Sequence, residues 1–172
     1  HLQGQLLRML TGMIRPKVVV EIGTYSGYSA LSMAAGMTAD AVLHTFEIND
    51  EQEVFTRPWL EGSPYPPRIV LHIGEVEKLL PPMNLSIDLA FIDANKRQYV
   101  DYYNLLMPFI APRGYILADN TLWDGHVIDP AYDRDAQTRG IRAFNDLVRD
   151  DERVEKVILP LRDGLSLIRK IG

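Results

Sequence analysis

Short apolar runs alternate with helix-like stretches along the chain, and this alternation limits the possible folds more than any other feature of the sequence. The runs occupy residues 17–22, 41–48, 68–73, 87–93 and 114–120. Runs of Val, Ile, Leu and Phe that are apolar on both faces are typical of parallel strands covered by helices. We expect helices near residues 27–37, 50–60, 75–80, 96–107 and 136–149. The pattern therefore predicts consecutive strand–helix–strand units in an open α/β sheet.

The end of the chain has a different pattern. The segment "RVEKVILPLRDGLSLIRK" contains two strand-like runs on either side of Arg162-Asp163-Gly164, which is a hairpin signal. We therefore expect five parallel strands followed by a closing antiparallel pair. Residues 2–13 have the pattern of a helix packed outside the sheet.

Length and composition exclude several classes of protein. The 172 residues are most simply one domain, residues 1–172, although a chain that begins at His1 leads us to expect a missing N-terminal segment. No apolar run approaches the roughly 20 residues that span a bilayer, so we expect no membrane association. The absence of cysteine excludes disulfides and thiolate sites, and fits a cytoplasmic protein. A net charge of −5 argues against a broad nucleic-acid-binding surface.

Polar residues follow the predicted strands at the points where these strands end. Open α/β sheets bind their ligands beyond the carboxyl ends of the strands, so these residues are candidates for one site. They are Glu21 and Gly23 at the end of the first strand, Glu47 at the end of the second, Asp93 at the end of the fourth with Lys96 just past it, and Asp119 and Asn120 at the end of the fifth. The alternative for any single Asp or Asn is a helix cap.

The segment "EIGTYSGYSA" is the candidate cofactor turn. Its glycines are four residues apart, and Tyr25 lies between them, so the turn lacks the G-x-G-x-x-G spacing that admits a pyrophosphate. Glu21 favours a cationic ligand, such as an ammonium or a sulfonium. Glu47, 24 residues after Gly23, can accept hydrogen bonds from ribose hydroxyls. Ribose without phosphate, beside a positive charge, describes S-adenosylmethionine.

A second group has the composition of a metal site. Asp93, Asp119 and Asn120 offer hard oxygen ligands, which suit Mg²⁺ or Ca²⁺ better than zinc. Asp119-Asn120 could instead simply open a turn. Lys96 could be a solvated lysine, but a lysine in the first turn lies at the unfavourable end of the helix dipole, which calls for a local reason.

Six motifs together resemble the cation-dependent O-methyltransferases, the family that includes the catechol and caffeoyl-coenzyme A O-methyltransferases. They are "EIGTYSGYSALSMA", "FEIN", "FIDANKRQYVDYY", "LADNTLWDG", "IRAFND" and "LPLRDGLSLIRK". The resemblance implies a Rossmann-like methyltransferase fold: a seven-stranded, mostly parallel sheet with an antiparallel C-terminal hairpin and helices on both faces. It also implies a homodimer.

The resemblance assigns roles residue by residue. It implies S-adenosylmethionine contacts at Glu21, Gly23, Thr24, Tyr25, Ser29, Glu47, Val76 and Asp93. The divalent cation, Mg²⁺ or alternatively Ca²⁺ or Mn²⁺, is assigned to Asp93, Asp119 and Asn120, and the catalytic base to Lys96. The chain departs from the family's common D-A-D-K at Asn95, which stands where the second acid is usual.

The expected activity is therefore metal-dependent methyl transfer from S-adenosylmethionine to a hydroxyl of a catechol-like or other vicinal-oxygen small molecule. We expect residues 121–135 to form a loop over the site, with Trp123 beside the substrate ring. A hydroxylated uridine of tRNA is the alternative acceptor, although the acidic balance disfavours it. Two other classes stay open: a nicotinamide-dependent oxidoreductase, and a protein that binds the cofactor without catalysis.

Overall fold

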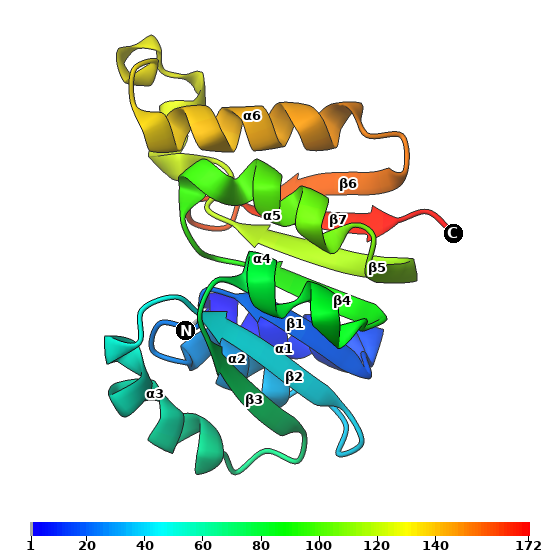
Figure 1. Ribbon diagram of the computed structural model, residues 1–172. Coiled ribbons are helices and arrows are strands. Elements are labelled where there is room, and N and C mark those ends of the chain that lie inside the picture. Colours follow the sequence, from blue (N-terminus) through cyan, green and yellow to red (C-terminus); the bar gives the residue numbers. More distant parts are fainter. Residues whose placement is uncertain (1) are drawn as a thin grey trace. The chain divides into compact units, whose positions relative to one another are not determined.

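The computed structural model describes residues 2–172, and within this range seven strands form a mixed sheet (Figure 1). The strand order is β3-β2-β1-β4-β5-β7-β6. Strand β7 (Leu165–Lys170) is antiparallel to β5 (Ile110–Asp119) and to β6 (Val154–Leu159). The predicted parallel strands and closing antiparallel hairpin are therefore confirmed.

The chain divides into two compact units, one ending at Leu89 and the other beginning at Ala90. The division falls within β4 (Ile87–Ile92), and each unit is described separately. That residues 1–172 form a single domain stays a prediction. Among the described residues, no helix is long and apolar enough to cross a membrane.

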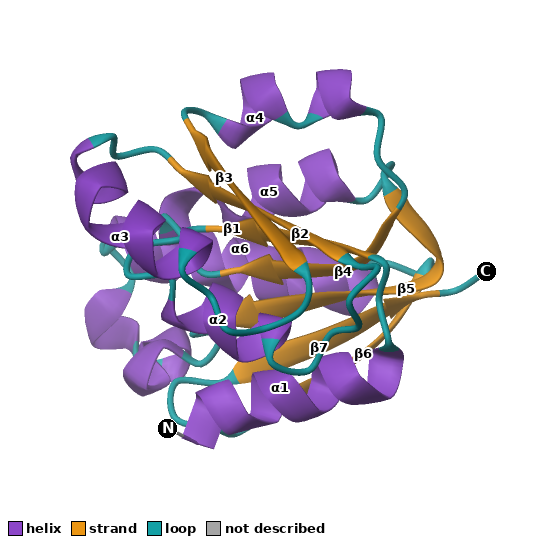
Figure 2. Cartoon of the chain, turned by 90° about the horizontal axis from the view of Figure 1, so that it is seen from below, coloured by secondary structure: helices purple, strands orange, loops and turns teal. Residues whose placement is uncertain are grey.

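The first unit is built on the parallel strands β1 (Val18–Ile22), β2 (Val42–Glu47) and β3 (Arg68–Ile73). Its helices are α1 (Leu2–Ile14), α2 (Tyr28–Ala34), α3 (Glu51–Glu61) and α4 (Val76–Leu79), followed by the 3₁₀ helix η1 (Pro81–Met83). Helices α1 and α2 lie on the opposite side of these strands from α4 (Figures 1 and 2). The core of this unit is aliphatic and aromatic, as the apolar runs predict, with Val19, Val20, Met33, Leu43 and Phe46 buried.

The second unit contains α5 (Tyr99–Leu106), β5, α6 (Ala136–Asp150), β6 and β7. Three 3₁₀ helices lie between these elements: η2 (Lys96–Gln98), η3 (Trp123–Ile128) and η4 (Pro130–Tyr132). Helices α5 and α6 pack against each other through aromatic side chains. The ring of Phe144 meets those of Tyr99 and Tyr103 edge-on, with ring centroids 5.4 and 6.0 Å apart.

Some element boundaries differ from the predicted ones. Strand β5 begins at Ile110, four residues before the expected start, because Pro112 and the left-handed backbone of Arg113 (φ 65°) interrupt the apolar pattern there. The helix expected over 96–107 begins as the 3₁₀ turn η2 and becomes α-helical at Tyr99. The helix expected over 75–80 is limited to the single turn of α4.

Candidate active-site residues

The cofactor turn, residues 23–27, joins β1 to α2 in the first unit. Its backbone is left-handed at three positions, Gly23 (φ 100°), Tyr25 (φ 45°) and Gly27 (φ 77°). A side chain at Gly27 would also collide with α3, because its Cβ would lie 2.9 Å from a methyl carbon of Leu60. The two glycines are therefore required by the shape of the turn, and Tyr25 needs its surroundings to hold it in a conformation that side chains disfavour.

Glu47 lies at the end of β2 with its carboxylate held against the cofactor turn. Its Oε2 accepts a hydrogen bond from the amide of Tyr25 at 2.8 Å, and its Oε1 accepts one from the amide of Asn49 at 2.9 Å. Both oxygens keep further lone pairs that can accept hydrogen bonds from hydroxyl groups. The carboxylate predicted to bind ribose is therefore oriented by the protein itself.

Glu21 is fully buried below the same turn. It accepts a 2.5 Å hydrogen bond from the hydroxyl of Thr45, which lies 2.6 Å from the hydroxyl of Thr24. The three side chains connect β1, β2 and the turn. This network gives Glu21 a role in shaping the turn, in addition to the negative charge that the sequence analysis emphasised.

Two other residues of the predicted cofactor set belong to the first unit. Ser29 is half-buried in the first turn of α2, and Val76 is buried at the first residue of α4. The eighth residue of that set, Asp93, belongs to the second unit.

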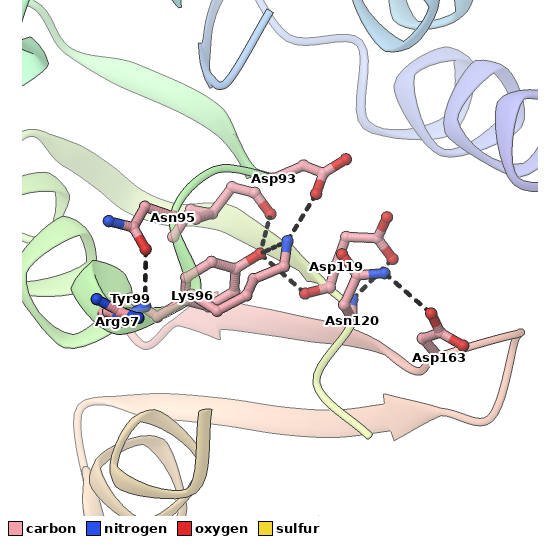
Figure 3. A network of polar contacts seen from close by, with 9 residues as sticks. Asp93, Asn95, Lys96, Arg97, Tyr99, Asp119, Asn120 and Asp163 are labelled. Carbon is pink, nitrogen blue, oxygen red and sulfur yellow. Dashed lines mark hydrogen bonds and ion pairs between the residues drawn. The ribbon is translucent and has the colours of Figure 1, made fainter. Parts of the chain in front are cut away.

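In the second unit, Lys96 is nearly buried, with only 8% of its surface exposed. Its ammonium nitrogen, Nζ, donates to Asp93 Oδ1 and to the hydroxyl of Tyr99, both at 2.8 Å (Figure 3). Helix α6 packs directly on the lysine backbone, since a Cβ at Gly140 would lie 2.3 Å from the Lys96 carbonyl oxygen. Lys96 is therefore not a solvated surface lysine, and its contacts supply the local reason for its place in a first turn.

The hydroxyl of Tyr99 connects the ends of β4 and β5. It lies 3.3 Å from the carbonyl oxygen of Ile92 and 3.0 Å from that of Asp119, and it accepts the hydrogen bond from Lys96. Burial raises the pKa of Tyr99 well above its ordinary value, and the charges of Asp93 and Asp119 raise it further. The phenol therefore stays neutral and orients Lys96 as an acceptor.

The predicted metal ligands lie at the same strand ends. Asp93 follows β4 with 40% of its side chain exposed, and the buried Asp119 ends β5 and accepts from the amide of Asn120 at 2.8 Å. Asn120 has a left-handed backbone (φ 58°), and its Nδ2 donates to Asp163 Oδ2 at 3.5 Å (Figure 3). That bond uses the amide nitrogen and leaves the amide oxygen as the group suited to a cation.

This donor set fits a hard divalent cation. It comprises two carboxylates and one amide oxygen. Among the described residues, no group of three or more His, Cys, Asp or Glu side chains could hold a metal ion, and a set of two Asp and one Asn is not such a group. Mg²⁺ usually takes one or two carboxylates and completes its octahedron with water or substrate oxygens, and the residue types of this set match that preference. Hard oxygen donors of this kind suit Mg²⁺, Ca²⁺ or Mn²⁺ better than zinc.

Asn95 has a structural role at the departure from the D-A-D-K pattern. Its Oδ1 accepts from the amide of Arg97 at 3.2 Å, and its Nδ2 donates to Gln98 Oε1 at 3.0 Å. An aspartate could make the first of these bonds but not the second. The amide therefore closes the turn that presents Lys96.

The sequence analysis missed two residues of this cluster, Tyr99 and Asp163. Tyr99 lies one turn after Lys96, and that spacing was the available signal. The sequence places Asp163 only in a hairpin turn. In the structure its carbonyl accepts from the amides of Leu122 and Trp123 at 2.6 and 3.2 Å, so the turn is attached to the segment that follows Asn120.

Trp123 lies in the loop expected to cover the site. The Lys96 ammonium lies 6.0 Å from the centroid of the Trp123 ring, within cation–π range. His126, in the same loop, stacks on Tyr132 with ring centroids 3.5 Å apart. Trp123 is therefore the member of this loop that accompanies Lys96, and His126 packs within the loop.

The seven-stranded sheet and the glycine turn, with the carboxylate of Glu47 held against it, define a Rossmann-like methyltransferase. The chain belongs to the O-methyltransferase family, because the sequence model of that family matches residues 1–171. This confirms the resemblance described above and disfavours a nicotinamide-dependent oxidoreductase.

Individual relatives support the family assignment. Caffeoyl-CoA O-methyltransferase 2 of Zea mays is 33% identical over 98% of this chain and 68% of its own length. The enzyme of the same name from Eucalyptus globulus is 33% identical over 99% of this chain and 73% of its own length.

Solved structures agree in fold. An O-methyltransferase from Bacillus cereus, in complex with SAH, is 26% identical with a TM-score of 0.90, and the match covers 98% of this chain and 80% of that one. The O-methyltransferase TomG from Streptomyces achromogenes, in complex with SAM, is 26% identical with a TM-score of 0.89, over 99% and 80% of the two chains.

Proposed function

We propose that this protein transfers a methyl group from S-adenosylmethionine to a hydroxyl of a catechol-like small molecule, with the help of a divalent cation. The observation that carries the proposal is the placement of Lys96. Its nitrogen is buried, oriented by Tyr99, and hydrogen-bonded to Asp93, one of the three residues proposed as oxygen ligands at the ends of β4 and β5.

The methyl donor is assigned to the first unit. The cofactor turn lacks the glycine spacing that admits a pyrophosphate, and the oriented carboxylate of Glu47 can accept hydrogen bonds from ribose hydroxyls. The complexes of the Bacillus and Streptomyces relatives with SAH and SAM support this choice of cofactor.

The metal and the base are assigned to the second unit. Asp93, Asp119 and Asn120 would hold Mg²⁺, Ca²⁺ or Mn²⁺, and such an ion lowers the pKa of a hydroxyl that binds to it. In its neutral form, Lys96 would accept the proton of that hydroxyl as the general base. Tyr99 keeps the lysine nitrogen in place, and Trp123 gives the substrate ring an apolar wall.

The substrate class follows from this chemistry. A cation held by three protein oxygens has positions left for two neighbouring oxygens of one substrate, so a vicinal diol on an aromatic ring is favoured. The caffeoyl-CoA O-methyltransferases among the relatives support a phenolic acceptor. The tRNA alternative is disfavoured by the net charge of −5. A homodimer and a cytoplasmic location stay predictions.

Two measurements test the proposal. Calorimetry should detect binding of S-adenosylmethionine and no binding of NAD, and the opposite result would contradict the methyltransferase assignment. Methylation of a catechol should stop when EDTA is added and return with Mg²⁺, while cofactor binding persists. Asp119→Ala and Asn120→Ala should reproduce the effect of EDTA, and full activity in EDTA would give these residues a structural role only.

A further inference from the structure

Helix α3 is packed on the cofactor turn through two side chains. Thr56 and Leu60 are the residues of α3 that are buried, and both reach the turn. Leu60 and the methyl group of Thr56 occupy the space in which a side chain at Gly27 would lie, at 2.9 and 3.3 Å from its Cβ. The opposite side of the helix is exposed, including Val54 and Phe55. The buried side of α3 therefore serves the cofactor turn.

The hydroxyl of Thr56 makes a specific polar contact with this turn. It donates a 2.5 Å hydrogen bond to the carbonyl oxygen of Tyr25, and Thr56 is only 1% exposed. The amide of the same Tyr25 donates to Glu47 Oε2 at 2.8 Å. One residue in a left-handed conformation is thus held at its carbonyl by α3 and at its amide by the end of β2.

We infer that Thr56 is a positioning residue for the cofactor, acting through Tyr25 on the carboxylate of Glu47. A left-handed tyrosine persists only where its surroundings determine it, and Thr56 supplies the bond at its carbonyl. Without that bond the peptide of Tyr25 relaxes, and its amide no longer fixes Glu47 Oε2. The carboxylate then has to be ordered when the cofactor binds, which costs affinity.

The inference rests on the proposed function, because it takes Glu47 to be the residue that binds ribose. It adds to that function a residue of α3 that touches neither the methyl group nor the metal. Because Thr56 would act only on the binding of the cofactor, its loss should appear in cofactor affinity and in KM for S-adenosylmethionine. The kcat at saturating cofactor should be preserved.

Thr56→Val tests the inference, because valine keeps the shape and removes only the hydroxyl. With S-adenosylhomocysteine as the calorimetric probe, we expect affinity to fall about three- to tenfold, the usual effect of one lost hydrogen bond. Thr56→Ser should restore it to within about twofold of the wild type, since serine keeps the hydroxyl. The matched control is Thr138→Val, which likewise removes one fully buried threonine hydroxyl, but from α6 in the second unit.

A double-mutant cycle separates positioning from general stabilisation. If Thr56 acts through Glu47, adding Thr56→Val to Glu47→Ala should change the remaining affinity by less than about twofold. Equal losses in both backgrounds would overturn the inference, as would wild-type affinity in Thr56→Val. A wild-type protein that binds no S-adenosylhomocysteine would refute the proposed function itself, and the inference with it.

Amide hydrogen exchange provides a measurement that needs no variant. The Tyr25 amide should be protected in the wild-type protein without cofactor, because it is bonded to Glu47 before the ligand arrives. Exchange at the rate of an open peptide would overturn the inference, even if Thr56→Val failed to fold.

Discussion

The buried hydroxyl of Tyr99 lies 2.8 Å from the ammonium nitrogen of Lys96 and also reaches the backbone carbonyl of Asp119. One side chain thus orients the proposed base and holds the strand end that carries a proposed metal ligand. Tyr99→Phe should lower turnover about tenfold through misplacement of Lys96 and should destabilise the protein by about 1–2 kcal/mol through the unsatisfied carbonyl. Steady-state kinetics and urea unfolding check this. Tyr102→Phe is the control, because its hydroxyl bonds Gln98, and an equal turnover loss there would contradict the prediction.

Lys96→Met should separate proton removal from positioning. If Lys96 is the general base, cofactor and metal binding should be retained while turnover falls roughly 10²–10⁴-fold. The loss should shrink as the pH approaches the pKa of the free phenol, and also for nitrocatechols, because solvent then supplies the ionised nucleophile. A loss that is independent of pH and equal for both substrates would assign Lys96 to electrostatic positioning, and another residue would have to be the base.

Glu47→Ala should weaken the binding of S-adenosylmethionine by about 2–4 kcal/mol, because two ribose hydroxyls lose a charged acceptor. The same change also releases the amides of Tyr25 and Asn49. Calorimetry measures the affinity, and Glu53→Ala, an acid on α3 that pairs with Arg57, is the control. Unchanged affinity in Glu47→Ala would remove this residue from the cofactor site.

Asp163 should matter for metal affinity although it is not one of the predicted ligands. Its Oδ2 accepts from Asn120 Nδ2, which would leave the amide oxygen of Asn120 to bind the proposed cation. Asp163→Ala should weaken the binding of Mn²⁺, followed by electron paramagnetic resonance, by about tenfold, the low end of such supporting interactions. Asp163→Asn, which keeps an acceptor oxygen, should recover most of the affinity. If both variants lose affinity equally, the charge of Asp163 matters instead. Asp146→Ala, which removes an exposed acid on α6, is the control.

The stability of the protein should fall in mild acid because of His44. Its ring lies against His72, with Nδ1 3.0 Å from His72 Nε2. Burial, and then the nearby His72 and Arg68, lower the pKa of His44 to about 4. Between pH 6.5 and 4 the unfolded chain therefore binds more protons than the folded one, and the free energy of unfolding decreases as the pH is lowered through this window. Because the ring is only half-buried, we expect a total loss of about 1–2 kcal/mol.

Urea unfolding at several pH values measures that loss. His44→Phe should reduce the dependence between pH 4.5 and 6.5 without abolishing it, because one titrating ring is removed while its stacking surface is kept, and His72, whose pKa burial also lowers, remains. An unchanged slope in this variant would assign the acid sensitivity to other groups.

The sequence by itself determined the elements of the fold and the residue types of the site. Strands and helices follow from the local period of apolar residues, which a single segment carries. The left-handed backbone at Gly23 and Gly27 follows likewise from local chemistry. The end of each strand could be predicted within a few residues, and with it Glu47, Asp93 and Asp119.

Only the tertiary structure decided which groups orient these residues. Thr56 meets Tyr25 across 31 residues of sequence, Tyr99 meets Asp119 across 20, and Asp163 meets Asn120 across 43. Each contact is a single hydrogen bond between elements whose register and packing set the distance. No local periodicity encodes such a bond, because one residue of slip along a strand turns a side chain to the opposite face. The sequence therefore carried the proposed reactive groups, and the packing of α3, α5 and the β6–β7 turn set their orientation.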